Sequence, residues 1–547
     1  MQLSPKAPLL GLDGPLDSRA GACPPMAAAV ALGVMTSIMG TVYARALKGA
    51  VTATWRTLPG LLPTANPSLV VPAICTMGGA LIGVLASNLP SVTMPDFIGS
   101  QTSTTTSLPG VWPFLPRVLL LSLLTSTFGF SVGPEAPMVL AGGLVGSSFS
   151  KRLYGESDHA MARTMAFVGA AGALTTFIGM PLAGAIFVLE ITRPAAGLTA
   201  GAYDALAPAV AASVASLLTA KALLAPLKPI GGHFVYAPMP IGDALTGRSM
   251  AAVGLSAGVG GALIGLVFRL LVQTYKRPMW PQAPEDETCE TARRWPHIRC
   301  GPRMRHTLVK SSVGLAVGWA ASCVGAPRSL DTQTAHKFRT AQLPTPPLLL
   351  TRLAPRHAVC RAATNSLVGV LFPQTLFWGE GSLQHMIDGQ ATPLAAVWPW
   401  AGLQGALSPE AMARFALVDP TRPFASPVDA LKVGAAKLVA IALACAGGFP
   451  GGIIFPLFFC AAAFAHGAAG VLVPAALVPC WVMCLMAATQ ASVTRTPLAT
   501  VFMLGLSATA SAQLSVLLPP VIVASYVGVW AAQLLSKETF FPYEPKQ

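Results

Sequence analysis

The stretch GFSVGPEAPMVLAGGLVG, residues 129–146, carries one acidic side chain in a run that is otherwise fit for the interior of a membrane. Glu135 lies between Pro134 and Pro137, and five glycines occur in the same stretch. A carboxylate is costly when it faces lipid, so an acidic residue in an apolar segment faces the protein interior or a water-filled cavity. The stretch therefore predicts a polar functional site inside a membrane protein.

The composition places the rest of the chain in a bilayer as well. Of the 547 residues, 53% are hydrophobic and only 10% are charged, whereas soluble proteins carry about 25% charged residues. Many of the apolar runs contain Gly or Pro, which favours broken helices around a polar site over straight spanning helices. The predicted fold class is an all-α, multi-pass integral membrane protein. The apolar runs lie near residues 25–47, 67–89, 115–150, 160–192, 203–225, 249–274, 306–322, 428–447, 452–471, 478–508 and 512–535.

The charged residues and cysteines exclude several other classes of protein. The net charge is +14, and many basic residues lie in two connections, 276–310 and 328–361. Basic loops on one side of a membrane explain this distribution, so we expect the lipid bilayer as a partner and no nucleic acid. The ten cysteines have no paired spacing and the eight histidines are scattered. We therefore expect no disulfide framework, no metal and no cofactor.

Two segments, one in each half of the chain, share a local pattern. Residues 179–192 read GMPLAGAIFVLEIT, and residues 495–507 read RTPLATVFMLGLS, with Pro-Leu-Ala in register. A Gly/Pro break precedes each segment: GPEAP at 133–137 and GGFPGGIIFP at 447–456. This ordered pair indicates an internal repeat. Paired interrupted segments point to a transport site at the bilayer midplane, and halves that cross an odd number of times are inverted.

The repeat and the polar stretches divide the chain. Residues 323–364 interrupt an otherwise continuous apolar segment, so we interpret them as a disordered insertion. We expect a tail at 1–24 without a secretory signal, a first transmembrane half at 25–225, a connecting region at 226–322 with a polar loop at 277–305, the insertion at 323–364, a second transmembrane half at 365–535, and a tail at 536–547 without a regulatory domain.

The Gly/Pro breaks suggest how an anion is bound. The first turn of a helix presents unpaired backbone N–H groups, and with the helix dipole these make a positive but uncharged end that attracts anions. The breaks at 133–137 and 447–456 would each open such a helix. Glu135 is itself an anion, so it competes for the site when ionised and vacates it when protonated or displaced. The glutamate is thus interpreted as a gate.

These residues resemble the CLC family of chloride channels and proton-coupled chloride exchangers, over nearly the whole chain. GPEAP is similar to the family's Gly-x-Glu-Gly-Pro motif, with Ala136 in place of the second Gly. GGFPGGIIFP is similar to its Gly-x-Phe-x-Pro motif, with Ile454 in place of Phe. The segments 181–194, 430–448 and 495–506 resemble the helices that flank these motifs.

The resemblance implies a homodimer with one chloride pathway in each subunit, gated by Glu135. It also implies that the backbone N–H groups of Ile453 and Ile454 bind the central anion. In full, the implied anion site consists of Ser91, Thr93, Gly133, Pro134, Glu135, Ala136, Ile453, Ile454, Phe455, Phe541 and Tyr543.

Two of the family's anion ligands are altered in this chain. The Gly-Ser-Gly-Ile-Pro motif is reduced to SVTMP at 91–95, which leaves Ser91 or Thr93 as the hydroxyl that contacts the anion. Either residue could equally be a helix N-cap. The family's tyrosine from the last helix falls by count on Phe541, and Tyr543 lies two residues later.

The mechanism depends on the residue after Glu190. Exchangers of the family usually carry a proton-route glutamate at the position of Ile191, and an aliphatic side chain relays no proton. Adjacent helical positions point about 100° apart, so Glu190 is a poor replacement; it could also serve a structural role at a helix end. We therefore expect a passive, gated chloride channel, with a proton-coupled anion exchanger as the alternative.

Two further classes are less consistent with the sequence. An integral-membrane enzyme would need paired Asp, a His cluster or a Ser/His pair in the apolar segments, and none is visible in the sequence. We therefore expect no enzyme. A non-conducting membrane scaffold stays open because the serine and tyrosine motifs are altered.

Overall fold

A computed structural model describes residues 25–61, 66–88, 92–102, 107–192, 204–224, 234–239, 247–276, 356–508, 514–536 and 540–541. In these ranges the chain folds into helices joined by irregular segments, with one isolated β-bridge. Among the described residues, eight helices are long and apolar enough to cross a membrane, and three shorter apolar helices accompany them. The prediction of an all-α, multi-pass membrane protein is confirmed.

The main helices of the described residues form two series of seven. The first series is α1 (Met26–Thr52), α3 (Pro67–Asn88), α5 (Val111–Thr127), α6 (Glu135–Tyr154), α7 (His159–Ile178), α8 (Pro181–Thr192) and α10 (Leu206–Leu224). The second is α11 (Gly247–Lys276), α15 (Arg356–Leu371), α18 (Pro427–Ala446), α19 (Ile454–Leu472), α20 (Val478–Thr494), α21 (Pro497–Ser507) and α22 (Leu514–Leu535). Short helical turns lie between them: η1 (Ala53–Thr57), α2 (Leu58–Gly60), α4 (Met94–Thr102), η3 (Pro373–Thr375), η4 (Glu380–Ser382), α16 (Leu383–Ile387), η5 (Leu394–Ala396), η6 (Gly405–Leu407), α17 (Pro409–Ala413) and η7 (Ala475–Leu477).

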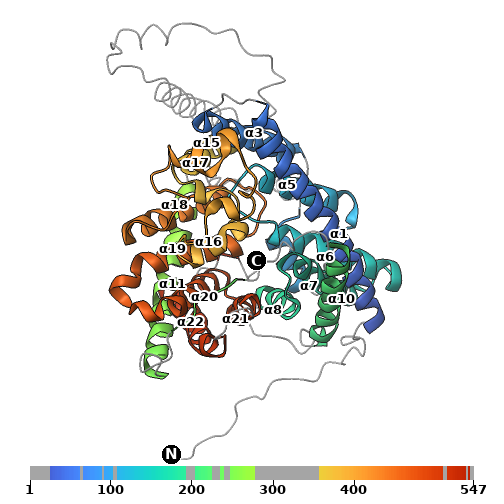
Figure 1. The fold of residues 1–547 in the computed structure, drawn as a ribbon. Helices are drawn as coiled ribbons and strands as arrows, with labels where there is room; N and C mark the ends of the chain where they lie inside the picture. Colours follow the sequence, from blue (N-terminus) through green and yellow to red (C-terminus); the bar gives the residue numbers. More distant parts are fainter. Residues whose placement is uncertain are drawn as a thin grey trace, which may run out of the picture.

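The packing within the second series repeats that within the first. In the first, α1 packs on α7 and α10, and α7 packs on both α6 and α8. In the second, α11 packs on α20 and α22, and α20 packs on both α19 and α21. Figure 1 shows the first series, in blue to green, gathered on one side of the molecule and most of the second, in orange to red, on the other. Within the described residues, the internal repeat predicted from two short motifs therefore extends over both series of helices.

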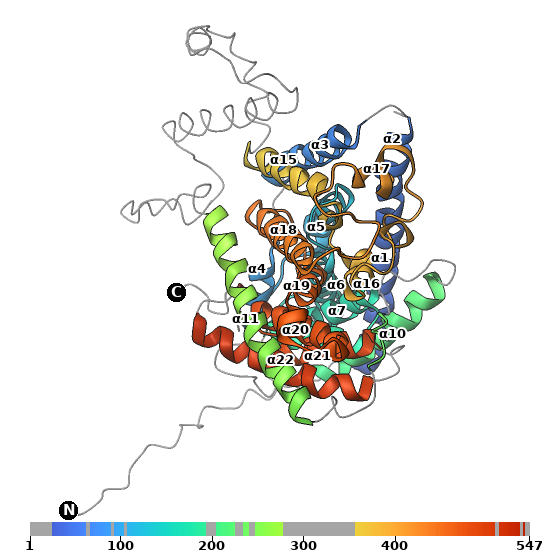
Figure 2. The same cartoon turned by 60° about the vertical axis from the view of Figure 1, so that its left-hand side comes forward.

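The two series meet along a few elements. Helix α8 packs on α21, and α3 packs on α15. The second of these contacts lies at the top of the view in Figure 2. The irregular segments before α6 and α19 also meet, and this contact forms the site described below. Each of these helix contacts joins a helix of the first series to the helix at the same position of the second series. Side chains at corresponding positions of the repeat are therefore brought together.

Local sequence signals explain where several helices begin and end. The Asp158 carboxylate accepts from the N–H of Met161 at the start of α7, and the Ser426 hydroxyl accepts from the N–H of Asp429 at the start of α18. Helix α7 ends at Gly179, which has a left-handed φ of 74°, and α20 ends at Arg495, which has a φ of 60°. Capping groups of this kind satisfy the backbone groups that a helix end leaves unpaired.

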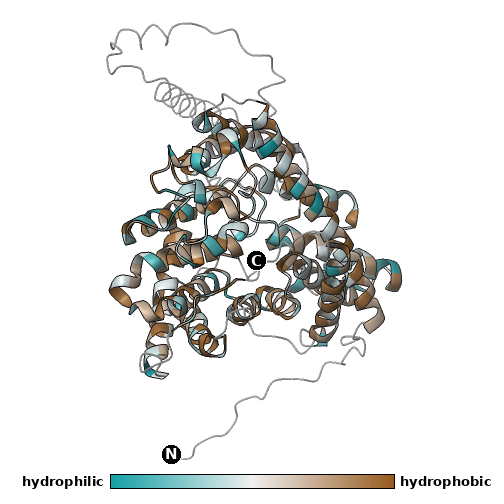
Figure 3. Ribbon diagram, in the orientation of Figure 1, coloured by the Kyte–Doolittle hydropathy of each residue, from teal (hydrophilic) through white to brown (hydrophobic). Residues whose placement is uncertain are grey.

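Small residues allow the helices to approach closely. A Cβ added at Gly142 or Gly146 of α6 would collide with the backbone of α7. In lipid such small-residue contacts replace the hydrophobic drive to association. The outward faces are apolar, as Figure 3 shows, and large side chains such as Leu218 and Trp530 are 63% and 60% exposed. These faces are suited to contact with lipid.

The structure corrects one predicted boundary. Helix α15 begins at Arg356, so the last part of the segment 323–364 belongs to the membrane fold rather than to an insertion. The more polar residues 356–364 form the first turns of this helix, ahead of the apolar sequence after 364. The rest of that segment, the polar loop 277–305, the apolar run 306–322 and the tail 1–24 lie outside the described residues.

Candidate functional site

The two Gly/Pro breaks are joined directly to one another. Gly133 and Gly452 form an antiparallel β-bridge, in which the Gly133 N–H donates to the Gly452 carbonyl at 2.8 Å and the Gly452 N–H donates back at 2.5 Å. The rings of Phe130 and Phe449 stack beside it with centroids 4.1 Å apart. An inverted repeat relates its two halves by a twofold axis, and residues near that axis meet their counterparts in antiparallel orientation. The bridge and the paired rings have this arrangement.

Each break delivers a helix N-terminus to this bridge. In α6 the first intrahelical bond runs from Met138 to Pro134, and in α19 it runs from Leu457 to Ile453. The N–H groups of the preceding residues, Glu135 and Ala136 in α6 and Ile454 and Phe455 in α19, come before these bonds. Two helix N-termini therefore converge on one place, a geometry that favours an anion.

The Glu135 side chain occupies this place. Its carboxyl is 1% exposed and lies against the Cα atoms of Gly133 and Gly452, where an added Cβ would overlap it. The backbone amide of Phe455 faces the carboxyl. Within the described residues, however, neither carboxyl oxygen has a hydrogen bond of normal geometry. No such hydrogen bond among the described residues therefore fixes the carboxyl in place. The carboxyl lies where the two halves of the repeat meet.

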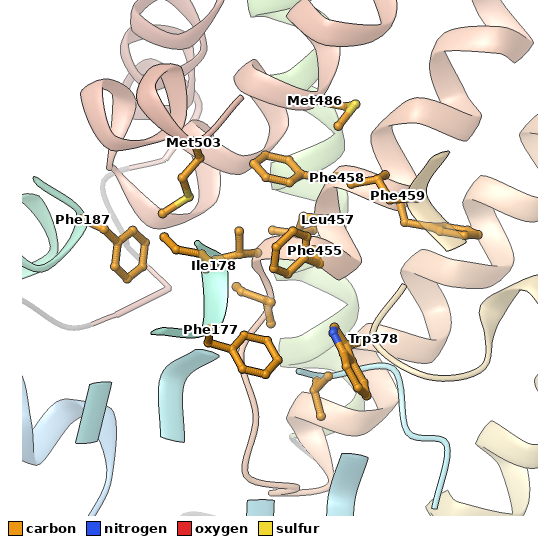
Figure 4. Close-up of a cluster of buried hydrophobic side chains, with 14 of the residues drawn as sticks. Phe177, Ile178, Phe187, Trp378, Phe455, Leu457, Phe458, Phe459, Met486 and Met503 are labelled. Atoms are coloured by element: carbon orange, nitrogen blue, oxygen red, sulfur yellow. The ribbon is translucent and has the colours of Figure 1, made fainter. Parts of the chain in front are cut away.

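A cavity of about 730 Å³ opens beside the carboxyl. Among the described residues that line it, Glu135 is the one acid and Lys276, at the end of α11, is the one cation. Most of the wall is apolar. The predicted site residues Thr93, Ala136, Ile453, Ile454 and Phe541 line this central cavity with Glu135. Gly133 and Pro134 are buried next to it, and the Phe455 ring points away into the core that Figure 4 shows.

The hydroxyl predicted to contact the anion is engaged elsewhere. Thr93 immediately precedes α4, and both its hydroxyl and its N–H donate to the Asp96 carboxylate, at 2.6 and 2.8 Å. This is one half of a helix capping box, in which the acid at the third helical position binds the N–H of the N-cap residue. Thr93 therefore stands at the N-cap position of α4, which is the other role considered for this residue. Phe541 supplies a ring and no hydroxyl at the cavity. Ser91 and Tyr543 lie outside the described residues.

The structure separates the roles of Glu190 and Ile191. The Glu190 carboxylate accepts from the N–H groups of Leu498 and Ala499, at 3.1 and 2.8 Å, and so caps the first turn of α21 in the opposite half. Ile191 is completely buried and lines the central cavity. The acid is therefore used to join the two halves, while the aliphatic residue faces the cavity.

A buried lysine near the site, Lys437, was not among the residues predicted from the sequence. The Lys437 ammonium in α18 donates to the carbonyls of Phe377 at 2.7 Å and Thr375 at 2.9 Å, and lies 4.9 Å from the centroid of the Phe459 ring. The Ser131 hydroxyl donates to the same Thr375 carbonyl at 2.5 Å. Lys437 therefore anchors the segment that leads to Glu135. Its signal was available, because it is a charged residue inside the apolar run 428–447.

The fold and the site define a multi-pass membrane protein built on an inverted repeat, with a buried carboxyl where the broken helices of the two halves meet. The family model described as voltage gated chloride channel matches residues 109–284 and 311–533. The chain belongs to this family, the CLC family, whose members are chloride channels and transporters.

Curated relatives match part of the chain. YfeO of Escherichia fergusonii, named for ion transport, is 26% identical over 242 residues, which are 42% of this chain and 53% of the relative. The YfeO protein of Shigella flexneri is 25% identical over 242 residues, which cover the same shares of the two chains. The chain thus spans about half the length of these relatives.

Solved structures match nearly the whole chain in fold. A slow cyanobacterial Cl⁻/H⁺ antiporter superposes with a TM-score of 0.61 at 17% identity, covering 94% of this chain and 96% of the other. A CLC-type fluoride/proton antiporter gives a TM-score of 0.58 at 17% identity, with the same coverage. A eukaryotic CLC transporter gives 0.56 at 15% identity, covering 94% and 72%.

Proposed function

We propose that this protein is a gated pathway through which chloride crosses a membrane passively, and that Glu135 is its gate. The observation that carries the proposal is the position of the Glu135 carboxyl, between two helix N-termini and at the wall of the central cavity. An anion that enters the cavity reaches the uncharged helix ends only when the carboxyl moves away. Helix ends bind an anion more weakly than a paired cation would, which lets the ion leave again.

The wall of the cavity supports passive transport. A second acid that could pass protons from Glu135 across the cavity is replaced by Ile191, and the neighbouring Glu190 is held by α21. A proton released by the gate therefore meets an apolar wall on this side. Chloride movement is then independent of proton movement.

A proton-coupled exchanger is the second candidate. The size of the central cavity, about 730 Å³, favours it, because this space can hold a chain of waters that carries protons past Ile191. The two functions share the gate and the anion site. They differ in whether protons cross with the anion.

The direct test of the shared function is chloride efflux from liposomes that contain the purified protein, with a potassium ionophore to balance charge. Efflux well above that of empty liposomes is expected. No efflux from correctly folded protein would support a non-conducting scaffold instead. We also propose a homodimer, on the basis of the resemblance to the family; mass measurement in detergent should give twice the mass of the chain.

Gly452→Ala should open the gate without removing its carboxyl. The added methyl group would overlap Oε2 of Glu135, which is the end of a flexible side chain, so the carboxyl is expected to move. Overpacking costs about 1–3 kcal/mol, which corresponds to a shift of about 5–150-fold toward the displaced gate. The chloride efflux rate at equal protein content measures this shift.

Gly470→Ala is the matched control for this variant. It lies on the same helix, α19, and an added Cβ there would meet no atom within 4 Å. Its efflux should equal that of the wild type. Equal efflux from well-folded Gly452→Ala would show that the carboxyl does not block the pathway.

A further inference from the structure

A second buried acid lies near the gate and has no part in the mechanism so far. Glu380 begins η4, in the connection 372–426 between α15 and α18, and is 4% exposed. The indole N–H of Trp378 donates to its Oε2 at 2.9 Å, whereas Oε1 is buried without a hydrogen-bond partner within the described residues. A buried carboxyl oxygen without a partner is costly, so a structural role alone does not account for this side chain.

Its surroundings are aromatic and lead toward the gate. Trp378 packs against Phe177 at 6.4 Å and Trp398 at 5.0 Å between ring centroids, and η4 packs on α19, the helix whose N-terminus faces Glu135. Figure 4 shows Trp378 and Phe177 close to one another below Phe455. Glu380 does not line the central cavity. It lies in the connection 372–426, and we call the side of the membrane domain that carries this connection the connection side.

The segments that carry the two acids are bonded directly to one another, because the Phe377 N–H donates to the Gly129 carbonyl at 3.0 Å and the Ser131 hydroxyl donates to the Thr375 carbonyl. Burial raises the pKa of the Glu380 carboxyl well above its usual range, the Trp378 N–H lowers it, and the charge of Glu135 raises it again. A carboxyl with a raised pKa keeps its proton to higher pH and can therefore act as a donor near neutrality. Two interacting acids titrate as a pair.

Other charged groups near Glu380 are already engaged. Lys437, from α18, donates to the carbonyls of Thr375 and Phe377. In α16 the buried His385 pairs through Nδ1 with the Thr392 carbonyl, and Asp388 accepts from Thr392. Glu135, in contrast, has no hydrogen bond of normal geometry within the described residues.

We propose that Glu380 is the proton donor and acceptor of the gate, and that it passes protons between the solution on the connection side and Glu135. In this step the O–H bond of Glu380 breaks and an O–H bond forms on Glu135. A hydronium ion from the connection side then restores the proton on Glu380. With Ile191 on the other side, protons reach the gate and return without crossing. The gate therefore responds to pH on the connection side only. This inference rests on the proposed role of Glu135 as the gate.

The test is the rate at which chloride current responds to a pH step applied to each side of a bilayer in turn. Glu380→Gln should slow the response from the connection side by about tenfold or more, because a positioned acid or base commonly contributes 10²–10⁴-fold. A pH step on the cavity side should give no comparable response in the wild type or in the variant, and the conductance of the open pathway should not change. Trp378→Phe, which keeps the ring and removes the N–H donor, should slow the same response by a smaller factor.

Glu410→Gln is the control, since it removes an exposed carboxylate from the same connection. A response of Glu380→Gln as fast as that of the wild type would overturn the proposal. A fast response of the wild type to a pH step on the cavity side would also overturn it, because protons would then reach the gate without passing Glu380.

A second readout does not depend on transport. Infrared spectra of the purified protein in lipid should show a protonated carboxyl band near neutral pH that Glu380→Gln removes and Glu135→Gln shifts. If the wild type passes no chloride, the gated pathway is wrong, and this band still decides the protonation of Glu380. Absence of the band, or its persistence in Glu380→Gln, would contradict the inference alone.

Discussion

Replacing Glu135 by Gln or Ala is expected to give a protein that conducts chloride at every pH and responds little to pH. The wild-type carboxyl lies between the two helix N-termini, so the pathway opens when the carboxyl is neutral or displaced. If one proton is taken up per opening, the ratio of open to closed protein changes up to about tenfold per pH unit. The Gln variant is permanently neutral, and the Ala variant lacks the side chain. Chloride current measured from pH 4 to pH 9 tests this.

Gln and Ala distinguish two properties of the gate. Gln retains the bulk of the side chain and removes only the charge, so its current should be smaller than that of Ala if bulk also restricts the pathway. Both variants should lose the pH dependence. If they conduct as the wild type does and keep its pH response, then Glu135 is not the gate.

Replacing Ile191 by Glu is expected to make chloride movement carry protons. Ile191 is completely buried and faces the central cavity, so a carboxyl there would stand where protons leaving Glu135 could be received. The ratio of protons to chloride should rise from about zero to a measurable value. Simultaneous recording of chloride and pH in proteoliposomes gives this ratio.

Ile191→Gln is the matched control, because it has the shape of Glu and does not titrate. It should move chloride without protons. Proton coupling in the control, or no coupling in a well-folded Ile191→Glu, would show that residue 191 does not decide the mechanism.

The sequence was sufficient to single out Glu135 as the candidate gate and to indicate the repeat. Glu135 could be identified because a lone acid among Gly and Pro in an apolar run has few structural explanations. The two Pro-Leu-Ala segments indicated the repeat because both begin a helix after a turn, at Pro181 and Pro497. Local signals of this kind survive in the sequence because they depend on neighbouring residues.

The contacts across the repeat could not be predicted. The pairing of Gly133 with Gly452 and the stacking of Phe130 on Phe449 join residues that are far apart in the chain. Nothing in either segment alone specifies its partner. The same holds for Glu190, whose carboxylate was expected at a helix end and caps a helix of the other half.

Two other side chains show a different limit. Thr93 had two possible roles in the sequence, and the choice depended on the orientation of Asp96, three residues later. Lys437 was detectable as a charge in an apolar run but was not singled out. Its role became visible only with the carbonyls of Thr375 and Phe377, which a distant connection brings to it.

The most direct test of the proposed mechanism is a flux measurement on the wild-type protein in liposomes, with chloride efflux and proton movement followed together under a chloride gradient. Passive transport predicts that chloride leaves without proton uptake and that a proton ionophore does not change the chloride rate in voltage-clamped vesicles. Proton uptake in fixed proportion to chloride efflux, including against a proton gradient, would contradict it. The protein would then be an exchanger whose protons pass Ile191 through the water of the central cavity.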